Sequence, residues 1–331
     1  MTSSNRTFLV TGAAGFIGSH TAVRLLERGD HVVGIDNVND YYDPARKRAN
    51  LLELNRVAQS SGSGSFTFVE NDIRNRAIVT ELFQTHSFSG VAHLAAMAGV
   101  RISVEDPWLY YDTNLTGTLN LLDAGHKHGN PNFVLASTSS AYGNTKVVPF
   151  IETDSADRPL APYPASKRSA ELLGHSYHHI QGVDFTALRF FTVYGPRGRP
   201  DMMAYKIFDA MRTGVSMPLF NGGQMYRDWT FVDDIVSGVV AAVDKRLGYE
   251  VINIGRGEPV LLADFVKQLE ELAGKKAPLV SEPMMRADVS YTYANIDKAR
   301  ALLGYQPTVS VEDGVRRFYE WYKSAVGDPG K

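Results

Sequence analysis

Short apolar runs alternate with helical patterns along the first half of the chain. Between two such runs, residues 20–29 place Leu25 and Leu26 on one helical face and end in Gly29, which is typical of a helix C-terminus. Strands that alternate with helices imply right-handed crossovers and a parallel sheet. The pattern therefore predicts an α/β fold with a Rossmann-type doubly wound parallel sheet. The predicted strands lie at residues 7–10, 31–36, 66–72, 90–96 and 132–138, and a further helical pattern covers residues 114–129.

The alternation fades in the second half of the chain, where proline, glycine and aromatic residues become denser. We therefore expect residues 1–188 to form the dinucleotide-binding Rossmann domain. Residues 189–331 are expected to form mainly a smaller C-terminal substrate-binding lobe. Strand and helix character returns near residues 231–258, so we expect this segment to rejoin the first domain.

Composition narrows the function classes. The 34 basic and 36 acidic residues give a formal net charge of −2, so no global electrostatic attraction to nucleic acid or to an anionic membrane is expected. Cysteine is absent, and the nine histidines show no metal-ligand spacing, so we expect no metal site. The N-terminus resembles no signal peptide and no apolar run approaches about 18 residues, which predicts a soluble, cytoplasmic protein.

A glycine-rich turn follows the first predicted strand. Gly12, Gly15 and Gly18 stand between a strand and a helix, where glycine lets the backbone approach a pyrophosphate at the helix N-terminus. Three glycines alone also fit an ordinary tight turn. Asp36 ends the next strand, where a carboxylate can bind both ribose hydroxyls and repel a 2'-phosphate, and Asn37 rather than arginine follows it. This favours NAD over NADP, although Asp36 also fits a solvated strand end.

A second motif carries candidate chemistry. Tyr163 and Lys167 are four residues apart, so both side chains lie on one helical face, and a nearby ammonium group lowers the pKa of a phenol. This spacing alone also fits an exposed helix surface. Thr138, Ser139 and Ser140 follow a predicted strand, and their hydroxyl groups suit a substrate oxygen beside the phenol.

Together these motifs resemble the extended short-chain dehydrogenase/reductase superfamily that acts on nucleotide sugars. The resemblance covers essentially the whole chain and includes residues 71–73 (NDI), 93–96 (HLAA) and 227–234 (RDWTFVDD). It implies that Tyr163 and Lys167 transfer the proton, that Thr138 binds the reacting hydroxyl and that Asn114 sits behind these residues. A packing residue in the helix interior is the alternative for Asn114. The cofactor-binding residues it implies are Gly12, Gly15, Phe16, Ile17, Gly18, Asp36, Asp72, Ile73, Leu94, Ala95, Ala96, Asn114, Tyr163, Lys167 and Phe190; Phe191 and core packing are the alternatives for Phe190.

The residues beside Thr138 bear on the reaction class. Related 4,6-dehydratases carry an Asp-Glu pair where this chain has Ser139 and Ser140, and related decarboxylases usually carry glutamate at the position of Ser140. A site with hydroxyl groups alone suits an epimerase, because a 4-keto sugar needs no further acid or base before the hydride returns to its other face.

Four segments outside the shared cofactor motifs are similar to the UDP-glucuronate 4-epimerases: residues 36–48, 98–107, 176–183 and 189–201. The resemblance implies that Thr192 and Arg199 face the sugar carboxylate, with Arg197 as the alternative to Arg199. It also implies that Arg227 and Arg286 bind the UDP diphosphate, as suits the guanidinium fork.

The resemblance implies NAD-dependent C4 epimerisation of UDP-glucuronate to UDP-galacturonate by an isomerase that forms a homodimer. Its partner is a UDP-sugar substrate. A UDP-hexose 4-epimerase, a UDP-glucuronate decarboxylase and a catalytically silent dinucleotide-binding regulator are the alternatives.

Overall fold

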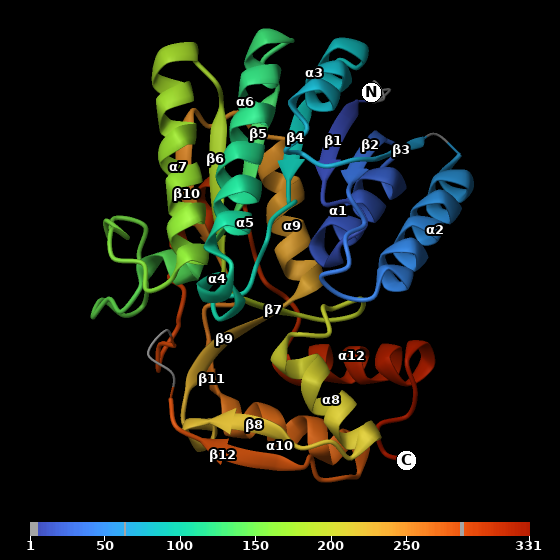
Figure 1. The fold of residues 1–331 in the computed structure, drawn as a ribbon, viewed down its shortest axis with the longest axis vertical. Coiled ribbons are helices and arrows are strands. Elements are labelled where there is room, and N and C mark those ends of the chain that lie inside the picture. Colours follow the sequence, from blue (N-terminus) through green and yellow to red (C-terminus); the bar gives the residue numbers. More distant parts are fainter. Residues whose placement is uncertain (1–5, 63, 285–287) are drawn as a thin grey trace.

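Seven parallel strands form the central sheet of the computed structural model, which describes residues 6–62, 64–284 and 288–331 (Figure 1). Their order across the sheet is β10-β6-β5-β4-β1-β2-β3, and every neighbouring pair is parallel. The predicted Rossmann-type sheet is therefore confirmed. The strands are β1 (Thr7–Thr11), β2 (His31–Asp36), β3 (Phe66–Glu70), β4 (Gly90–His93), β5 (Asn132–Thr138), β6 (Phe185–Phe190) and β10 (Tyr249–Ile254).

Helices cover both faces of this sheet (Figure 1). One layer contains α3, α6 and α7, and the other contains α1, α2 and α9. Apolar side chains of the strands fill the space between the layers, as a sheet covered on both faces requires. The helices are α1 (Phe16–Glu27), α2 (Pro44–Ser61), α3 (Arg76–Thr85), α6 (Gly117–Lys127), α7 (Pro162–Gln181), α9 (Val232–Val243) and α11 (Asp297–Leu303).

The last strand of the sheet, β10, comes from far along the chain, and α9 precedes it. This segment overlaps the residues expected to rejoin the first domain. The exact boundaries at residues 188, 231 and 258 stay a prediction.

A smaller second lobe contains two short sheets and three principal helices (Figure 1). Its core is aromatic: Trp229 and Phe265 stack with ring centroids 3.8 Å apart, and Tyr194 packs edge-on against both. This packing explains the aromatic density of the second half. The elements are β7 (Thr192–Tyr194), α8 (Met203–Thr213), β8 (Met217–Phe220), η3 (Asn221–Gly223), β9 (Tyr226–Phe231), β11 (Pro259–Leu261), α10 (Leu262–Ala273), β12 (Leu279–Glu282) and α12 (Val311–Ala325).

Two local predictions differ from the structure. The pattern at residues 90–96 predicts one strand, but β4 ends at His93. The Leu94 N–H still bonds to the Thr11 carbonyl as well as to its hydroxyl, whereas the Ala95 N–H bonds to that hydroxyl and so leaves the strand ladder. The helix predicted over residues 114–129 begins as a π-helical turn, η1 (Asp112–Thr116), and becomes α-helical only at Gly117. The short elements around it are α4 (Ile102–Glu105), α5 (Pro107–Tyr111) and the 3-10 turn η2 (Ser139–Tyr142).

Within the described ranges, no helix is long and apolar enough to cross a bilayer. The same part of the chain brings no three or more histidine, aspartate or glutamate side chains together as a metal site.

Candidate active site

The glycine turn between β1 and α1 has the shape of a dinucleotide-binding loop. Gly12 has a φ of +70°, and a Cβ there would lie 2.8 Å from the Ala95 nitrogen. A Cβ on Gly18 would lie 1.9 Å from the Gly12 carbonyl oxygen, so both positions require glycine. Gly15 caps α1 without a side-chain hydrogen bond, which leaves the helix N-terminus at Phe16 open to an anion. These residues therefore fit a pyrophosphate group.

The turn lies where the strand order of the sheet reverses. β1 stands between β2 and β4, and ligands of doubly wound sheets bind at such a reversal. The Thr11 hydroxyl accepts hydrogen bonds from the N–H groups of Leu94 at 3.1 Å and Ala95 at 3.0 Å. This bends the chain after β4 toward the glycine turn and places Leu94, Ala95 and partly exposed Ala96 beside it.

Asp36 and Asp72 lie at neighbouring strand ends, where the adenosine half of NAD is expected. Each oxygen of the Asp36 carboxylate accepts one backbone N–H, from Val38 at 2.8 Å and from Ala14 at 3.1 Å. Burial raises the pKa of Asp36, while these hydrogen bonds and Lys47 act to lower it. Each oxygen keeps a second lone pair for a ribose hydroxyl. The Asp36 carboxylate therefore fits NAD.

The segment after β3 closes the adenosine side. The Asp72 carboxylate accepts a hydrogen bond from the Asn37 amide at 2.7 Å, which links the ends of β2 and β3. Ile73 is 4% exposed and packs against Gly117. A Cβ added to Gly117 would lie 2.6 Å from the Cδ1 atom of Ile73. Asp72 and Ile73 therefore lie at the edge of the sheet that carries Asp36, where the resemblance implies that they contact the cofactor. Ile17, in the first turn of α1, is partly exposed.

Tyr163, Lys167 and Thr138 come together at the end of β5. Tyr163 lies in the first turn of α7, and Thr138, the last residue of β5, shares a hydrogen bond with it. Burial raises the pKa of Tyr163, while this hydrogen bond and the charge of Arg199 act to lower it. Desolvation outweighs the nearby charges and raises the pKa of this tyrosine overall, and the expected lowering of that pKa by Lys167 stays a prediction.

Lys167 is a buried donor without a protein partner. Its side chain is 1% exposed, and its Nζ has no hydrogen-bond partner among the described residues. Burial lowers the pKa of Lys167 to about 8, while Glu171 acts to raise it. A buried amine that no protein group satisfies fits a ligand hydroxyl, such as those of the nicotinamide ribose.

Asn114 holds the framework behind these residues. Its Oδ1 accepts the Met97 N–H at 2.8 Å, and its Nδ2 donates to the Met97 carbonyl and to the Ser166 hydroxyl, both at 2.9 Å. The π-helical turn places this side chain between the loop after β4 and helix α7. Both amide hydrogens are used within the protein. Asn114 therefore fits the position behind the catalytic residues that the resemblance implies, while its contact with the cofactor stays a prediction.

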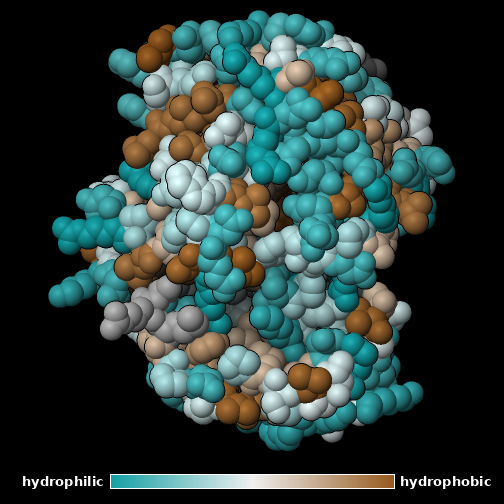
Figure 2. Space-filling view, in the orientation of Figure 1, coloured by the Kyte–Doolittle hydropathy of each residue, from teal (hydrophilic) through white to brown (hydrophobic). Residues whose placement is uncertain are grey.

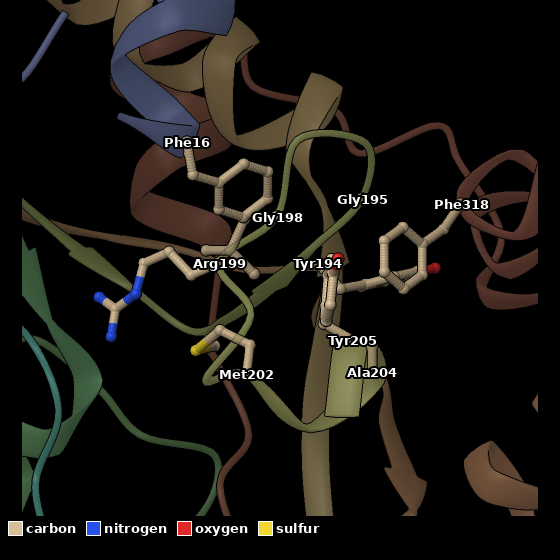
Figure 3. Close-up of a pocket in the computed structure, with 10 residues that line it drawn as sticks. Phe16, Tyr194, Gly195, Gly198, Arg199, Met202, Ala204, Tyr205 and Phe318 are labelled. Carbon is tan, nitrogen blue, oxygen red and sulfur yellow. The ribbon is translucent and has the colours of Figure 1, made fainter. Parts of the chain in front are cut away.

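Arg199 and Arg197 lie on opposite sides of the loop after β7. Arg199 acts electrostatically on Tyr163, and its guanidinium group points away from a cavity of about 10 Å³ between Phe16, Tyr194 and Phe318 (Figure 3). That cavity has room for a single water molecule at most.

Arg197 has a φ of +61° and faces helix α1, where its Nε lies 3.2 Å from the Nε2 atom of His20. Burial lowers its pKa to about 10, with Glu53 and Asp233 among the charges that raise it. Its surroundings are thus distant in the fold from Tyr163, which favours Arg199 as the substrate-facing arginine.

Thr192 and Phe190 also reach this edge of the sheets. Phe190 is the last residue of β6 and pairs with Thr138 in the sheet register. Phe191 packs against Phe150 with ring centroids 6.0 Å apart, and Phe190 belongs to the same buried core with 7% exposure, so a contact of Phe190 with the nicotinamide stays a prediction. Thr192 begins β7 and is partly exposed.

The neighbours of Thr138 add no charge to the site. Ser139 and Ser140 begin η2, and the Ser140 N–H donates to the Thr138 hydroxyl at 3.1 Å. This bond orients the Thr138 side chain toward the turn.

A separate group of arginines lies near the second lobe. Burial lowers the pKa of Arg227, with Asp288 acting to raise it and Arg101 to lower it. Arg101 stacks on Phe220 with its guanidinium carbon 3.9 Å from the ring centroid, and it pairs with Asp288 at 2.7 Å. Arg286, expected beside Arg227, lies outside the described residues.

Arg101, Tyr41 and Asp201 were not among the residues predicted for the site. The signal that pointed to them was the similarity of residues 36–48, 98–107 and 189–201 to the uronate-specific enzymes, but that similarity assigned them no role.

The fold and this arrangement of residues define an enzyme of the extended short-chain dehydrogenase/reductase class. The profile of the family described as GDP-mannose 4,6 dehydratase matches residues 9–318, and the chain belongs to this family.

Its relatives include enzymes with different sugar specificities. A UDP-glucuronate 4-epimerase of Thermodesulfobacterium geofontis is 44% identical over 320 residues, which are 96% of this chain and 97% of the relative. The crystal structure of UDP-glucuronic acid 4-epimerase from Bacillus cereus in complex with UDP-glucuronic acid and NAD is 38% identical, with a TM-score of 0.87 over 96% of this chain and 99% of that one. UDP-glucose 4-epimerase from Thermotoga maritima with UDP-glucose is 34% identical, with a TM-score of 0.87 over 97% and 99% of the two chains.

Proposed function

We propose that the protein is an NAD-dependent isomerase that interconverts UDP-glucuronate and UDP-galacturonate by inverting C4 of the sugar. The observation that carries this proposal is the position of Arg199: its Nη2 and the Tyr110 hydroxyl bond to the same Ala98 carbonyl, and the Tyr110 ring packs edge-on against Tyr163 with centroids 6.1 Å apart. A guanidinium group beside the proton-transfer residues suits a sugar that bears a carboxylate close to the reacting carbon. The relatives named as UDP-glucuronate 4-epimerases support the same reaction.

Each residue of the site has a step in this reaction. Tyr163 accepts the proton of the C4 hydroxyl, and Thr138 holds that hydroxyl through its own Oγ1. Lys167 places a positive charge near the phenol and donates to the ribose of the cofactor. NAD, when bound, would supply the hydride acceptor for C4 and then the hydride donor for the opposite face of that carbon. Tyr163 then returns the proton to the C4 oxygen, so the sugar is neither oxidised nor reduced overall.

The hydroxyl groups beside Thr138 support epimerisation over the reaction in the family's name. Removal of water from C5 and C6 needs an acid and a base near the sugar, and Ser139 and Ser140 provide neither at neutral pH. The absence of a glutamate at the position of Ser140 likewise argues against a decarboxylase.

The assay that tests the proposal supplies purified protein with NAD and UDP-glucuronate and identifies the products by chromatography and proton NMR. UDP-galacturonate as the only product supports the uronate 4-epimerase. A UDP-pentose with release of carbon dioxide indicates a decarboxylase. Turnover of UDP-glucose that survives loss of Arg199 indicates a UDP-hexose 4-epimerase, and no turnover of either sugar indicates a silent regulator.

Replacement of Arg199 with alanine is expected to lower kcat/KM for UDP-glucuronate roughly 10- to 100-fold, because a charge-assisted hydrogen bond to the carboxylate is lost. The 4-keto uronate is a β-keto acid, which loses carbon dioxide most easily when the carboxylate bond stands perpendicular to the carbonyl plane. We propose that Arg199 and Thr192 hold the carboxylate out of that alignment. Chromatography of the Arg199→Ala products should therefore reveal UDP-pentose beside the epimer.

Arg197→Ala is the matched control, since this arginine belongs to the same loop but faces α1. It should form UDP-galacturonate alone. A slower Arg199→Ala enzyme that makes no UDP-pentose would disprove the role in retaining the carboxylate.

We also propose a homodimer. Helix α7 and the elements before it expose Leu172, Leu119, Trp108 and Tyr111, with Trp108 79% exposed and Leu172 55% exposed. Figure 2 shows apolar side chains on the face over α6 and α7. Sedimentation analysis that gives a monomer mass would disprove this pairing. The cytoplasmic location stays a prediction.

A further inference from the structure

Three segments that lie far apart in the sequence meet around Arg199. Tyr41 comes from the loop after β2, Ala98 from the segment after β4, and Asp201 from the loop that carries Arg199. They belong to three of the four segments that are similar to uronate-specific enzymes, and that similarity gave none of these three residues a role. Their convergence on one guanidinium group suggests that they act on it together.

Asp201 occupies one edge of the Arg199 guanidinium group. The Arg199 Nε donates to one oxygen of the Asp201 carboxylate at 2.9 Å, and its Nη2 donates to the other at 2.5 Å. This two-point contact fixes the plane of the guanidinium group as well as its position. The side chains are 19% and 26% exposed, so water competes little with the pair.

Tyr41 and the Ala98 carbonyl hold this pair from the other side. Arg199 Nη2 donates to the Ala98 carbonyl at 3.1 Å, and the Tyr41 hydroxyl donates to the same oxygen at 2.9 Å. The Tyr41 hydroxyl also lies 3.3 Å from the carboxylate of Asp201, and its ring centroid lies 5.3 Å from the guanidinium carbon. Tyr110 reaches the Ala98 carbonyl at 3.3 Å.

The arrangement leaves one nitrogen of Arg199 for a ligand. Within residues 6–62, 64–284 and 288–331, no hydrogen-bond partner is found for Arg199 Nη1, whereas Nε and Nη2 are engaged. Because Asp201 neutralises the charge of Arg199, attraction by net charge is weak. Recognition of a second carboxylate then depends on the direction of the free N–H groups.

We propose that Asp201, supported by Tyr41, is a positioning residue that presents the free Nη1 edge of Arg199 to the sugar carboxylate and thereby makes the enzyme select uronates over neutral hexoses. This inference rests on the proposed function. Asp201 itself does not contact the substrate. It acts by preventing the flexible arginine from turning to other partners, which is how a buried counter-ion makes a binding group rigid.

The test compares Asp201→Asn and Tyr41→Phe with the wild-type enzyme. The quantities are kcat and KM for UDP-glucuronate, and the dissociation constants of UDP-glucuronate and UDP-glucose measured calorimetrically on the NAD-loaded protein. In Asp201→Asn, we expect the preference for UDP-glucuronate over UDP-glucose to fall roughly tenfold or more, because a misdirected arginine loses its hydrogen-bond geometry. Tyr41→Phe, which removes one hydroxyl, should shift the preference in the same direction by a smaller factor.

The control is Asp297→Asn, which removes an exposed aspartate from a similar short-range pair with Arg300 on α11. It should leave both dissociation constants unchanged. A fall in affinity for both sugars by the same factor, or no change in preference in either variant, overturns the proposal. If Asp201→Asn does not fold, the proposal is tested by the preference of Tyr41→Phe for UDP-glucuronate over UDP-glucose. If the wild-type enzyme does not epimerise UDP-glucuronate, both the proposed function and this inference are wrong. If the wild-type enzyme epimerises it but the variants keep the wild-type sugar preference, only this inference is wrong.

Discussion

Replacement of Tyr163 with phenylalanine is expected to lower kcat for UDP-glucuronate epimerisation by roughly 10²- to 10⁴-fold, the usual contribution of a positioned acid and base. Phenylalanine keeps the ring but has no group to accept the C4 proton. The glycine turn and Asp36 are unaffected, so NAD binding should change by less than about tenfold. The measurement combines steady-state kinetics by NMR with a titration of NAD binding.

Tyr177→Phe provides the matched control, since Tyr177 lies on the same helix and packs at its partly buried side. This variant should keep the wild-type rate. A Tyr163→Phe enzyme that retained more than about a tenth of wild-type kcat would show that another group transfers the proton. Thr138 would then be the first candidate, because it shares a hydrogen bond with the Tyr163 hydroxyl.

The environment of Tyr163 explains why several charges are gathered around it. Burial raises the pKa of the phenol, which favours its protonated form. Arg199 and the hydrogen bond with Thr138 act in the opposite direction. Lys167, whose pKa is about 8, still carries its charge at pH 7. We therefore expect proton transfer by Tyr163 to require these cations in place around the phenol.

Local sequence signals were enough to predict the sheet and the cofactor turn. The glycine spacing and apolar periodicity are fixed by backbone geometry within a few residues, and the structure confirms the parallel strands that follow from them. The position of Asp36 follows in the same way, because any residue at the end of β2 meets the edge where the strand order reverses.

Residues whose roles depend on distant partners could not be predicted in this way. From the sequence, Asp201 is expected to pair with Arg199 on an exposed loop. Only the fold brings Tyr41 next to Asp201. The π-helical turn at Asn114 is stabilised by hydrogen bonds to Met97 and Ser166. These bonds to other segments cannot be predicted from the periodicity of apolar residues in the helix. The same limit applies to Glu171, which reads as an ordinary polar residue one turn beyond Lys167.

In the structure Glu171 is the centre of a buried charge cluster. Its side chain has no exposed surface, and it accepts hydrogen bonds from Arg189 at 3.0 and 2.7 Å and from the Ser137 hydroxyl at 2.5 Å. Arg168 donates to it at 3.1 Å. Arg189 is 2% exposed, and Lys167 is also buried nearby, so Glu171 is the anion that offsets two buried cations.

Glu171→Gln is therefore expected to lower the free energy of unfolding by about 3–5 kcal/mol, the usual cost of removing one partner of a buried ion pair. The glutamine amide has nearly the same shape, so the loss reports the missing charge and acceptor. Urea unfolding followed by circular dichroism measures it. Glu271→Gln on α10 is the control, because that glutamate is 64% exposed and lies 3.7 Å from Lys267. Its loss should stay within about 0.5 kcal/mol.

The double variant Glu171→Leu with Arg189→Met separates charge from packing. The double variant removes the buried Arg189 charge together with its anion, so only Lys167 is left without Glu171. Replacement of a buried pair by apolar groups is often close to neutral. We expect the double variant to be more stable than Glu171→Gln by about 2 kcal/mol or more. If it is no more stable than the single variant, the cluster stabilises the fold through packing and the Ser137 bond rather than by compensating charge. Arg189 precedes Phe190 in β6, and Ser137 precedes Thr138 in β5. An intact cluster therefore keeps Thr138 and Phe190 in register at the ends of both strands.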